Sequence, residues 1–454
     1  MNESAYENYS TGRLNDAFEF CEGYKNFVST AKTEREVIIQ TIKIAEENGF
    51  VNIKEYLKNN NRLKPGDKIY DINMNKAMIL AVIGDEKLEN GLNIVGSHID
   101  SPRLDLKSTP IYEEGNICLL DTHYYGGIKK YQWTALPLAL HGVIVKKDGT
   151  KINVCYGENE NDPVFGISDL LPHLDKEKRT EVVTGEELNL IAGTIPDKNS
   201  TKEKVKQNII NLLKEKGIDK EDLFSSEIEA VPAGKARDFG LDKSMIMAYG
   251  QDDRVCAYAS IMAIINSETP KKTSICLLVD KEEIGSAGAT GMKSVFFENF
   301  VADIISLTTN YSDLKVRHCL KNSKMISSDV TAGYDPNRPT PFNKETEAYL
   351  GRGIAFCKYT GSKGKNDASD ANPEYIAQIR QILDNNGIFY QASEMGKVEA
   401  GGGGTISKLM AIYDMDVIDA GVPVISMHAP WEITAKVDIY ETYLTYKTFY
   451  HFMQ

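Results

Sequence analysis

The apolar positions follow two patterns along the chain. Some form short continuous runs, and others recur with the period of a helix over longer segments. Residues 275–279 form a short apolar run with β-branched members, and residues 77–83 and 93–95 resemble it. Residues 422–427 form another such run close to the C-terminal end. Runs of this length and composition predict buried strands, and we expect the first three to share one sheet.

Helical segments separate these runs. Thr33 and Glu36 have the spacing of a capping box, and an apolar stripe follows them up to a stop at residues 48–49, Asn-Gly. This pattern predicts a helix with defined ends. Residues 254–266 and 294–305 predict two further helices. Strands that alternate with helices indicate an α/β fold.

The middle of the chain has a different pattern. Residues 142–145 and 151–155 are strand-like, and the lysine-rich amphipathic segment 202–216 predicts a helix with one solvated face. We therefore expect two domains. They are a mixed-sheet catalytic domain formed by residues 1–105 plus 236–454, and a β-rich domain inserted at residues 106–235.

Composition narrows the classes of function. The chain has 454 residues, with 52 Lys and Arg against 65 Asp and Glu, which gives a net charge of −13. This charge argues against binding to nucleic acids or anionic membranes. The sequence shows neither a signal peptide nor an apolar run of about 20 residues, the length of a membrane span. Its seven cysteines are scattered and form no CxxC pair. We expect a cytoplasmic, reduced protein.

Candidate chemistry begins where two predicted strands end. Glu282 and Glu283 follow the strand at residues 275–279, and His98 and Asp100 follow the strand at residues 93–95. Each pair taken alone fits a solvated turn or a polar loop, because such short patterns are common. An aspartate two residues from a histidine can also accept its second ring N–H and fix its orientation toward a metal.

Three further segments supply similar groups. Asp252 and Asp253 stand at the entrance to the helix predicted at residues 254–266, where one aspartate would suffice as a cap. A carboxylate that bridges two metal ions would explain the second. Asp329 follows a short apolar stretch, and His428 ends the run at residues 422–427. A lone histidine at such a place is most simply a core residue, but these residues all occur at element ends of one predicted domain.

The combined set has a chemical logic. Two histidines and three carboxylates can hold two zinc-like ions if one carboxylate bridges them. Two such ions can activate a water molecule and polarise a carbonyl group. An additional carboxylate can accept the proton of that water and pass it on to a leaving amine. Adjacent glutamates suit this division, since one can bind metal and the other can face the water.

Several motifs occur in a fixed order along the chain: VGSHIDSPRLD, YYGGIKKYQW, LLPHLD, GQDDR, DKEEIGS, SSDVTAGYDP, GGGGT and VISMHAPWE. Through these motifs the chain resembles the aspartyl aminopeptidase and vacuolar aminopeptidase I family of dinuclear zinc exopeptidases. The resemblance implies a hydrolase that removes N-terminal residues from peptides. It also implies that the inserted domain builds dimers, and that the dimers assemble into a tetrahedral homododecamer with its active sites inside.

The resemblance assigns roles to individual residues. Glu282 matches the general base, and Asp100 would orient His98. His173, in LLPHLD, would reach the active site of a neighbouring subunit. Lys358 and Gly403, the latter in GGGGT, would contact the substrate. The implied metal ligands are His98, Asp252, Glu283, Asp329 and His428.

Three questions stay open at this point. The family often has asparagine after the bridging aspartate, whereas Asp253 follows Asp252 here, so either could bridge the two ions. Zinc is expected, with cobalt and manganese as alternatives. Lys358 fits a preference for acidic N-terminal residues, whereas YYGGIKKYQW is closer to the branch that favours neutral ones.

The alternative functions are a related dinuclear hydrolase, such as an N-acyl amino acid deacylase or a carboxypeptidase, and a catalytically silent assembly protein.

Overall fold

The computed structural model describes residues 4–175 and 182–454. The chain divides into two compact units. The larger unit comprises Met1–Asp100, Ala236–Met427 and Glu432–Gln454, within the described residues. The smaller unit comprises Ser101–Lys235 and His428–Trp431.

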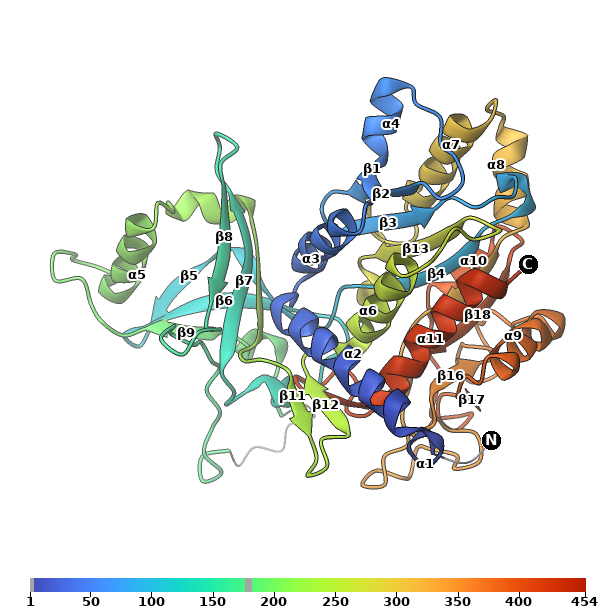
Figure 1. The fold of residues 1–454 in the computed structure, drawn as a ribbon. Coiled ribbons are helices and arrows are strands. Elements are labelled where there is room, and N and C mark those ends of the chain that lie inside the picture. The colour runs from blue at the N-terminus through green and yellow to red at the C-terminus, as the bar shows by residue number, and fades with distance from the viewer. Residues whose placement is uncertain (1–3, 176–181) are drawn as a thin grey trace. The chain divides into compact units, whose positions relative to one another are not determined.

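A nine-stranded mixed sheet forms the centre of the larger unit (Figure 1). Its strands are, in spatial order, β1 (Val51–Asn52), β2 (Lys68–Asn73), β3 (Ala77–Val82), β13 (Ser274–Val279), β4 (Asn93–His98), β14 (Lys324–Ser327), β18 (Asp416–Gly421), β16 (Ile354–Cys357) and β17 (Tyr390–Ser393). The four central strands β13, β4, β14 and β18 are parallel, while β3 and β16 run antiparallel to their central neighbours. Every residue of β3, β4 and β13 is buried, which explains their continuous apolar runs.

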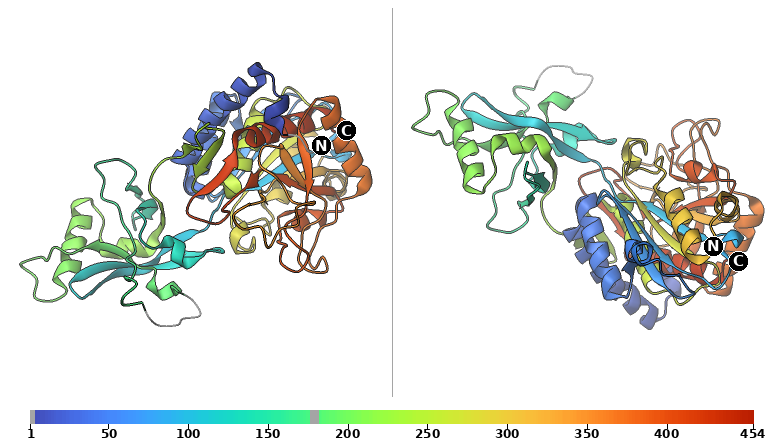
Figure 2. Two further views of the ribbon diagram at one scale, coloured as in Figure 1. Left: turned by 90° about the horizontal axis from the view of Figure 1, so that it is seen from below. Right: turned by 90° about the horizontal axis from the view of Figure 1, so that it is seen from above.

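Helices cover both faces of this sheet, as Figures 1 and 2 show. One face packs against α2 (Thr11–Thr30), α3 (Glu34–Glu47), α6 (Gln251–Ile265), α9 (Pro373–Asn385) and α11 (Lys436–Phe452). The other face packs against α4 (Ile53–Asn59), α7 (Phe296–Thr308), α8 (Asp313–Lys321) and α10 (Ser407–Ala411). The capping box of Thr33 and Glu36 is present at the start of α3. The predicted α/β class with a mixed sheet is confirmed.

Short elements complete the larger unit. They are α1 (Ala5–Asn8), a three-stranded sheet of β11 (Arg237–Phe239), β12 (Met245–Ala248) and β20 (Glu432–Ala435), and the pair β15 (Thr331–Ala332) and β19 (Pro423–Val424). The strand predicted at residues 422–427 is wrong in its extent. The sheet strand β18 ends at Gly421 and only two residues of β19 follow, because the backbone of Ser426 and His428 turns to positive φ values of 62° and 63°.

The smaller unit is built on a six-stranded antiparallel sheet. Its strands are, in spatial order, β8 (Lys151–Tyr156), β7 (Leu138–Val145), β10 (Ser226–Pro232), β5 (Arg103–Glu114), β6 (Ile117–Tyr125) and β9 (Leu190–Gly193). Helix α5 (Lys204–Glu215) buries Val205 and Ile210 and leaves Lys204 and Lys214 exposed. In the part of the chain that the structure describes, no helix has the length and apolar character needed to cross a membrane.

The parallel central strands determine where functional groups can gather. β4 ends at His98, β13 ends three residues before Glu282, and β14 ends two residues before Asp329. Parallel neighbours present their carboxyl ends at one edge of the sheet, which is where open α/β proteins place their ligand sites.

Candidate active site

His98 is held at the end of β4 with both ring nitrogens engaged. The side chain is 2% exposed. Its Nδ1 lies 3.0 Å from the carbonyl oxygen of Asp100 and 3.2 Å from Oδ1 of the same residue. Its Nε2 lies 3.1 Å from Oδ1 of Asp252 and 3.8 Å from Oδ1 of Asp329. A proton on Nδ1 would bind to Asp100, so that Nε2 would present its lone pair toward the carboxylates, as in metal-bound histidines.

Asp100 connects two strand ends. It is fully buried, and its carboxylate accepts the backbone N–H groups of Glu282, at 3.1 Å, and Glu283, at 3.2 Å. These two glutamates form the short 3₁₀ turn η5 (Glu282–Ile284) after β13. One buried carboxylate therefore orients the imidazole of His98 and also fixes the backbone of the glutamate pair.

Asp252 and Asp253 are held at the N-terminal end of α6. Both are buried, joined by a cis peptide bond, and have non-helical backbone angles, so that regular helix begins at Arg254. The backbone N–H of Asp252 donates to Oε2 of Glu432 at 3.0 Å. The first turn of a helix favours negative charge, which lowers the cost of placing carboxylates there.

These side chains form three overlapping groups, in each of which the candidate ligand atoms lie within 4.8 Å of one another. The groups are His98, Asp252 and Glu283; His98, Glu282 and Asp329; and Asp252, Asp253 and Asp329. We call these six residues the acidic group. One imidazole and five carboxylates in a buried place are a donor set that suits zinc, cobalt or manganese ions.

The electrostatics of the acidic group favour the binding of positive charge. Burial, together with the neighbouring carboxylates, raises the pKa of Asp253 and of Asp329 well above the usual range. Burial lowers the pKa of His98, but hydrogen bonds with Asp100 and Asp252 outweigh this effect. The pKa of His98 therefore lies well above its usual value. Without a cation, the cluster thus favours bound protons. Divalent ions can replace those protons, as metal binding at such sites generally does.

The smaller unit contains two of the predicted site residues. Nδ1 of His428 lies 3.0 Å from the carbonyl oxygen of Gly127, the second glycine of the YYGG motif. A Cβ atom at Gly127 would lie 3.2 Å from this nitrogen, so glycine permits the approach. His173 is exposed in a loop. Neither histidine belongs to a metal-competent group among the described residues, and the roles of both stay predictions.

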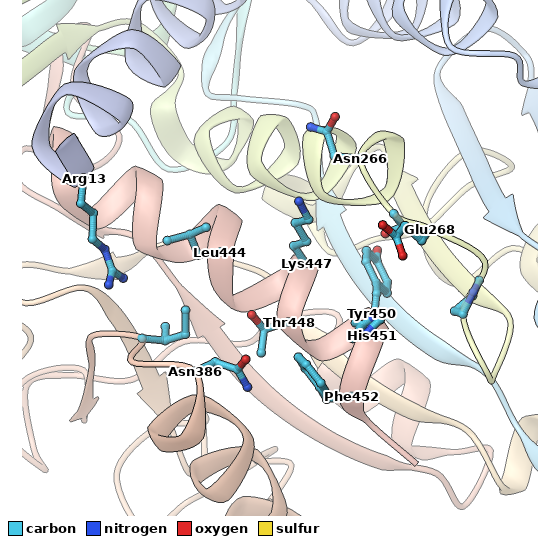
Figure 3. Close-up of a pocket in the computed structure, with 13 residues that line it drawn as sticks. Arg13, Asn266, Glu268, Asn386, Leu444, Lys447, Thr448, Tyr450, His451 and Phe452 are labelled. Atoms are coloured by element: carbon cyan, nitrogen blue, oxygen red, sulfur yellow. The ribbon is translucent and has the colours of Figure 1, made fainter.

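Lys358 and Gly403 are not brought into the acidic group. Lys358 is exposed directly after β16 and lines a cavity of about 830 Å³, and no member of the acidic group lines that cavity. The carbonyl oxygen of Gly403 accepts the N–H of Gly361 at 2.8 Å. Figure 3 shows a further cavity along α11, of about 450 Å³, with Arg13 at one end. The acidic group does not line this cavity either.

Two residues that support the site were missed in the sequence. Glu432 is 1% exposed and holds Asp252 from the strand β20, far along the chain. Gly421 ends β18 against the backbone of Asp329, where a Cβ atom would lie 2.0 Å from the carbonyl oxygen of Asp329. Both had a local signal: Gly421 directly precedes the apolar run at residues 422–427, and Glu432 is the last residue of the motif VISMHAPWE.

The chain is similar to known metalloproteases over most of its length. The model of the aminopeptidase I zinc metalloprotease (M18) family matches residues 27–450. A probable M18 family aminopeptidase 1 from Clostridium acetobutylicum is 55% identical over 98% of this chain and 97% of its own length. The crystal structure of an M18 family aminopeptidase from Thermotoga maritima has a TM-score of 0.95 and 41% identity, and covers 99% of both chains. The S. cerevisiae mApe1 dodecamer shares the fold, with a TM-score of 0.74 and 21% identity over 96% of this chain and 97% of that chain.

These similarities define a metallopeptidase, a hydrolase that acts on peptide bonds. The chain belongs to the M18 family of aminopeptidase I zinc metalloproteases. The family predicted from the motifs is confirmed, and so are the enzyme class and the aminopeptidase function.

Proposed function

We propose that this chain removes the N-terminal residue from peptides with two divalent metal ions held by the acidic group and a glutamate as general base. The observation that supports it most is the overlap of the three metal-competent groups. His98, Asp252 and Asp329 each belong to two of these groups, and a shared carboxylate is what a pair of adjacent ions with a bridging ligand requires. Zinc is the expected metal, because the family is one of zinc metalloproteases.

The ligands would be His98, Asp252, Glu283, Asp329 and His428. When bound, the ions supply Lewis acidity toward a water molecule and the scissile carbonyl group. Asp253 lies beside Asp252 and shares a group with Asp329, so it could take over the bridging position. Exchange of Asp252 or Asp253 for Asn would distinguish the two by the loss of bound metal.

Glu282 is the proposed base. It belongs to the group with His98 and Asp329, so its carboxylate lies among the ligand atoms. There it can accept a proton from an attacking water molecule and deliver it to the nitrogen of the departing amine. Asp100 accepts the backbone N–H of Glu282 and also contacts the ring of His98, so it holds the base and the histidine in fixed positions relative to each other.

The assembly and the substrate contacts are also proposals. We propose a homododecamer, as the S. cerevisiae mApe1 structure is a dodecamer. The family resemblance further suggests that it is tetrahedral and built from dimers, with His173 reaching the active site of a neighbouring subunit. Lys358 and Gly403 are proposed to contact the substrate. The cytoplasmic location stays a prediction.

The test is a set of initial rates on dipeptides that begin with Asp, Glu or Leu, each with a free and with an N-acetylated amine. An aminopeptidase cleaves only the free-amine form, and the ratio of rates for Asp and Leu assigns the branch. Equal or faster cleavage of the acetylated form would instead favour a deacylase or carboxypeptidase. No cleavage of any peptide by metal-loaded protein would favour the silent assembly protein.

A further inference from the structure

A second charged cavity lies in the larger unit, beside the strands β16 and β17 and the helix α9. Its volume is about 830 Å³, which is in the range of small-molecule sites. Its charged lining residues are Lys344, Arg352, Lys358, Arg380, Glu345 and Glu347. Four cations and two carboxylates give this lining a net charge of +2, in a chain whose net charge is −13.

Among the described residues, none of the four cations forms a close ion pair with a carboxylate. Arg380 still has neighbours that stabilise its charge, because Tyr390 and, after it, Asp384 raise its pKa. The Arg352 guanidinium lies 4.2 Å from the ring centroid of Tyr349, and the Lys344 ammonium lies 5.7 Å from that of Tyr334. The carboxylate of Glu347 instead accepts backbone N–H groups. The cavity therefore has positive charge to offer to a ligand.

Arg352 is also positioned firmly. The side chain of Gln391 bonds to the backbone N–H and carbonyl of Tyr349, both at 2.9 Å, and to the carbonyl of Gly353 at 3.1 Å. The buried carboxylate of Asp438 accepts the N–H groups of Gly351 and Gly353, both at 2.7 Å. The backbone on both sides of Arg352 is thus tied to buried side chains, so that little freedom is lost when its guanidinium binds a ligand.

The remaining wall is apolar. Phe356, Ile379, Tyr390 and Ile418 are buried residues that line it. Arginine forks match carboxylate and phosphate groups, and an apolar wall suits a hydrocarbon or aromatic body. The cavity in Figure 3 differs in this respect, because its Arg13 is already paired with Glu441 at 2.6 Å.

We propose that the cavity lined by Lys344, Arg352, Lys358 and Arg380 binds a small organic anion that carries a phosphate or carboxylate groups on an aromatic or apolar body. The cavity and the acidic group share no residue, and Lys358 is the lining residue that is also proposed above to contact the substrate. The cavity gives the protein a second ligand besides the peptide substrate.

Isothermal titration calorimetry on the metal-loaded protein at low salt tests this site. Adenosine monophosphate and phenylsuccinate are the probes, since both join an aromatic body to negative groups and they separate phosphate from carboxylate recognition. At least one of them is expected to bind, and uncharged adenosine is not. Arg352→Gln and Arg380→Gln should each weaken that binding at least tenfold, whereas Arg317→Gln on α8 should leave it unchanged.

The variants are first checked for unaltered thermal unfolding and unaltered kcat, so that loss of binding reports on the cavity alone. Failure of both probes to bind would overturn the proposal. So would binding that persists in both variants but disappears when metal is removed, since that result would place the anion at the acidic group. Loss of binding in only one variant would still support the proposed site in this cavity and would identify the arginine that binds the anion.

Discussion

Asp100→Asn tests whether the buried carboxylate between β4 and η5 organises the metal site. Asp100 is fully buried and its carboxylate faces three donors: the His98 ring and the N–H groups of Glu282 and Glu283. An asparagine keeps one oxygen and replaces the other by an NH₂ group, which is itself a donor. At least one of these three donors therefore loses its acceptor.

The size of the effect follows from this count. A buried donor left without a partner costs about 1–3 kcal/mol. At about 1.4 kcal/mol per factor of ten, this amounts to roughly fivefold to 150-fold in metal affinity or kcat/KM. Replacement of residues that orient metal ligands typically costs about 10–100-fold, which agrees with this range.

Two assays measure it. Competition with a chelating dye gives the zinc dissociation constant, and initial rates give kcat/KM on the same preparation. Asp16→Asn, on the exposed side of α2, is the matched control and should change neither quantity. An Asp100→Asn protein with the zinc affinity and kcat/KM of the unmodified chain would refute the role given to Asp100.

Three further substitutions or conditions give distinct results. Glu282→Gln should lower kcat by about 10²–10⁴ while the metal content stays the same, and an unchanged kcat would remove Glu282 as the base. Gly421→Ala places a Cβ 2.0 Å from the carbonyl oxygen of Asp329 and should lower both stability, by about 1–3 kcal/mol, and metal affinity. The loss of stability is measured as a lower Tm. Gly364→Ala is the control, because the space around Gly364 is open. Burial, together with the nearby Glu441, outweighs the backbone hydrogen bonds from Gly351, Gly353 and Arg352 and raises the pKa of Asp438 from 3.8 to about 8. The folded protein therefore keeps a proton that the unfolded chain releases, so the free energy of unfolding from urea titrations should fall as pH rises from 5 to 8. Asp438→Asn should flatten that slope, and an unaltered slope would contradict the account.

The centre of the site could be predicted because its signals are local. His98, Glu282 and Asp329 each come three residues after the end of an apolar run, and such runs in an α/β protein become parallel strands whose ends meet. The capping box at Thr33 was likewise readable, since its partners are three residues apart. What the pattern did not contain is the register between strands, which places Val279 beside His98 and Ser327 beside Gly96.

The residues that were missed depend on distant parts of the chain. Glu432 contacts Asp252 across 180 positions of sequence, and no neighbour of either residue indicates the pairing. The apolar run at residues 422–427 looked like one strand, but φ is positive at Ser426 and His428, which the apolar pattern does not indicate. The substrate role expected of Lys358 from its motif stays a prediction, and the structure adds that this lysine lines a cavity with Arg380 from α9.

The most direct test of the central claim is a metal titration of the chelated protein, with bound metal and the cleavage rate of a free-amine dipeptide measured on the same samples. The proposed dinuclear site predicts a negligible rate without metal and full recovery as zinc, cobalt or manganese reaches two ions per chain. Metal-free protein that cleaves the peptide at the full rate would contradict it.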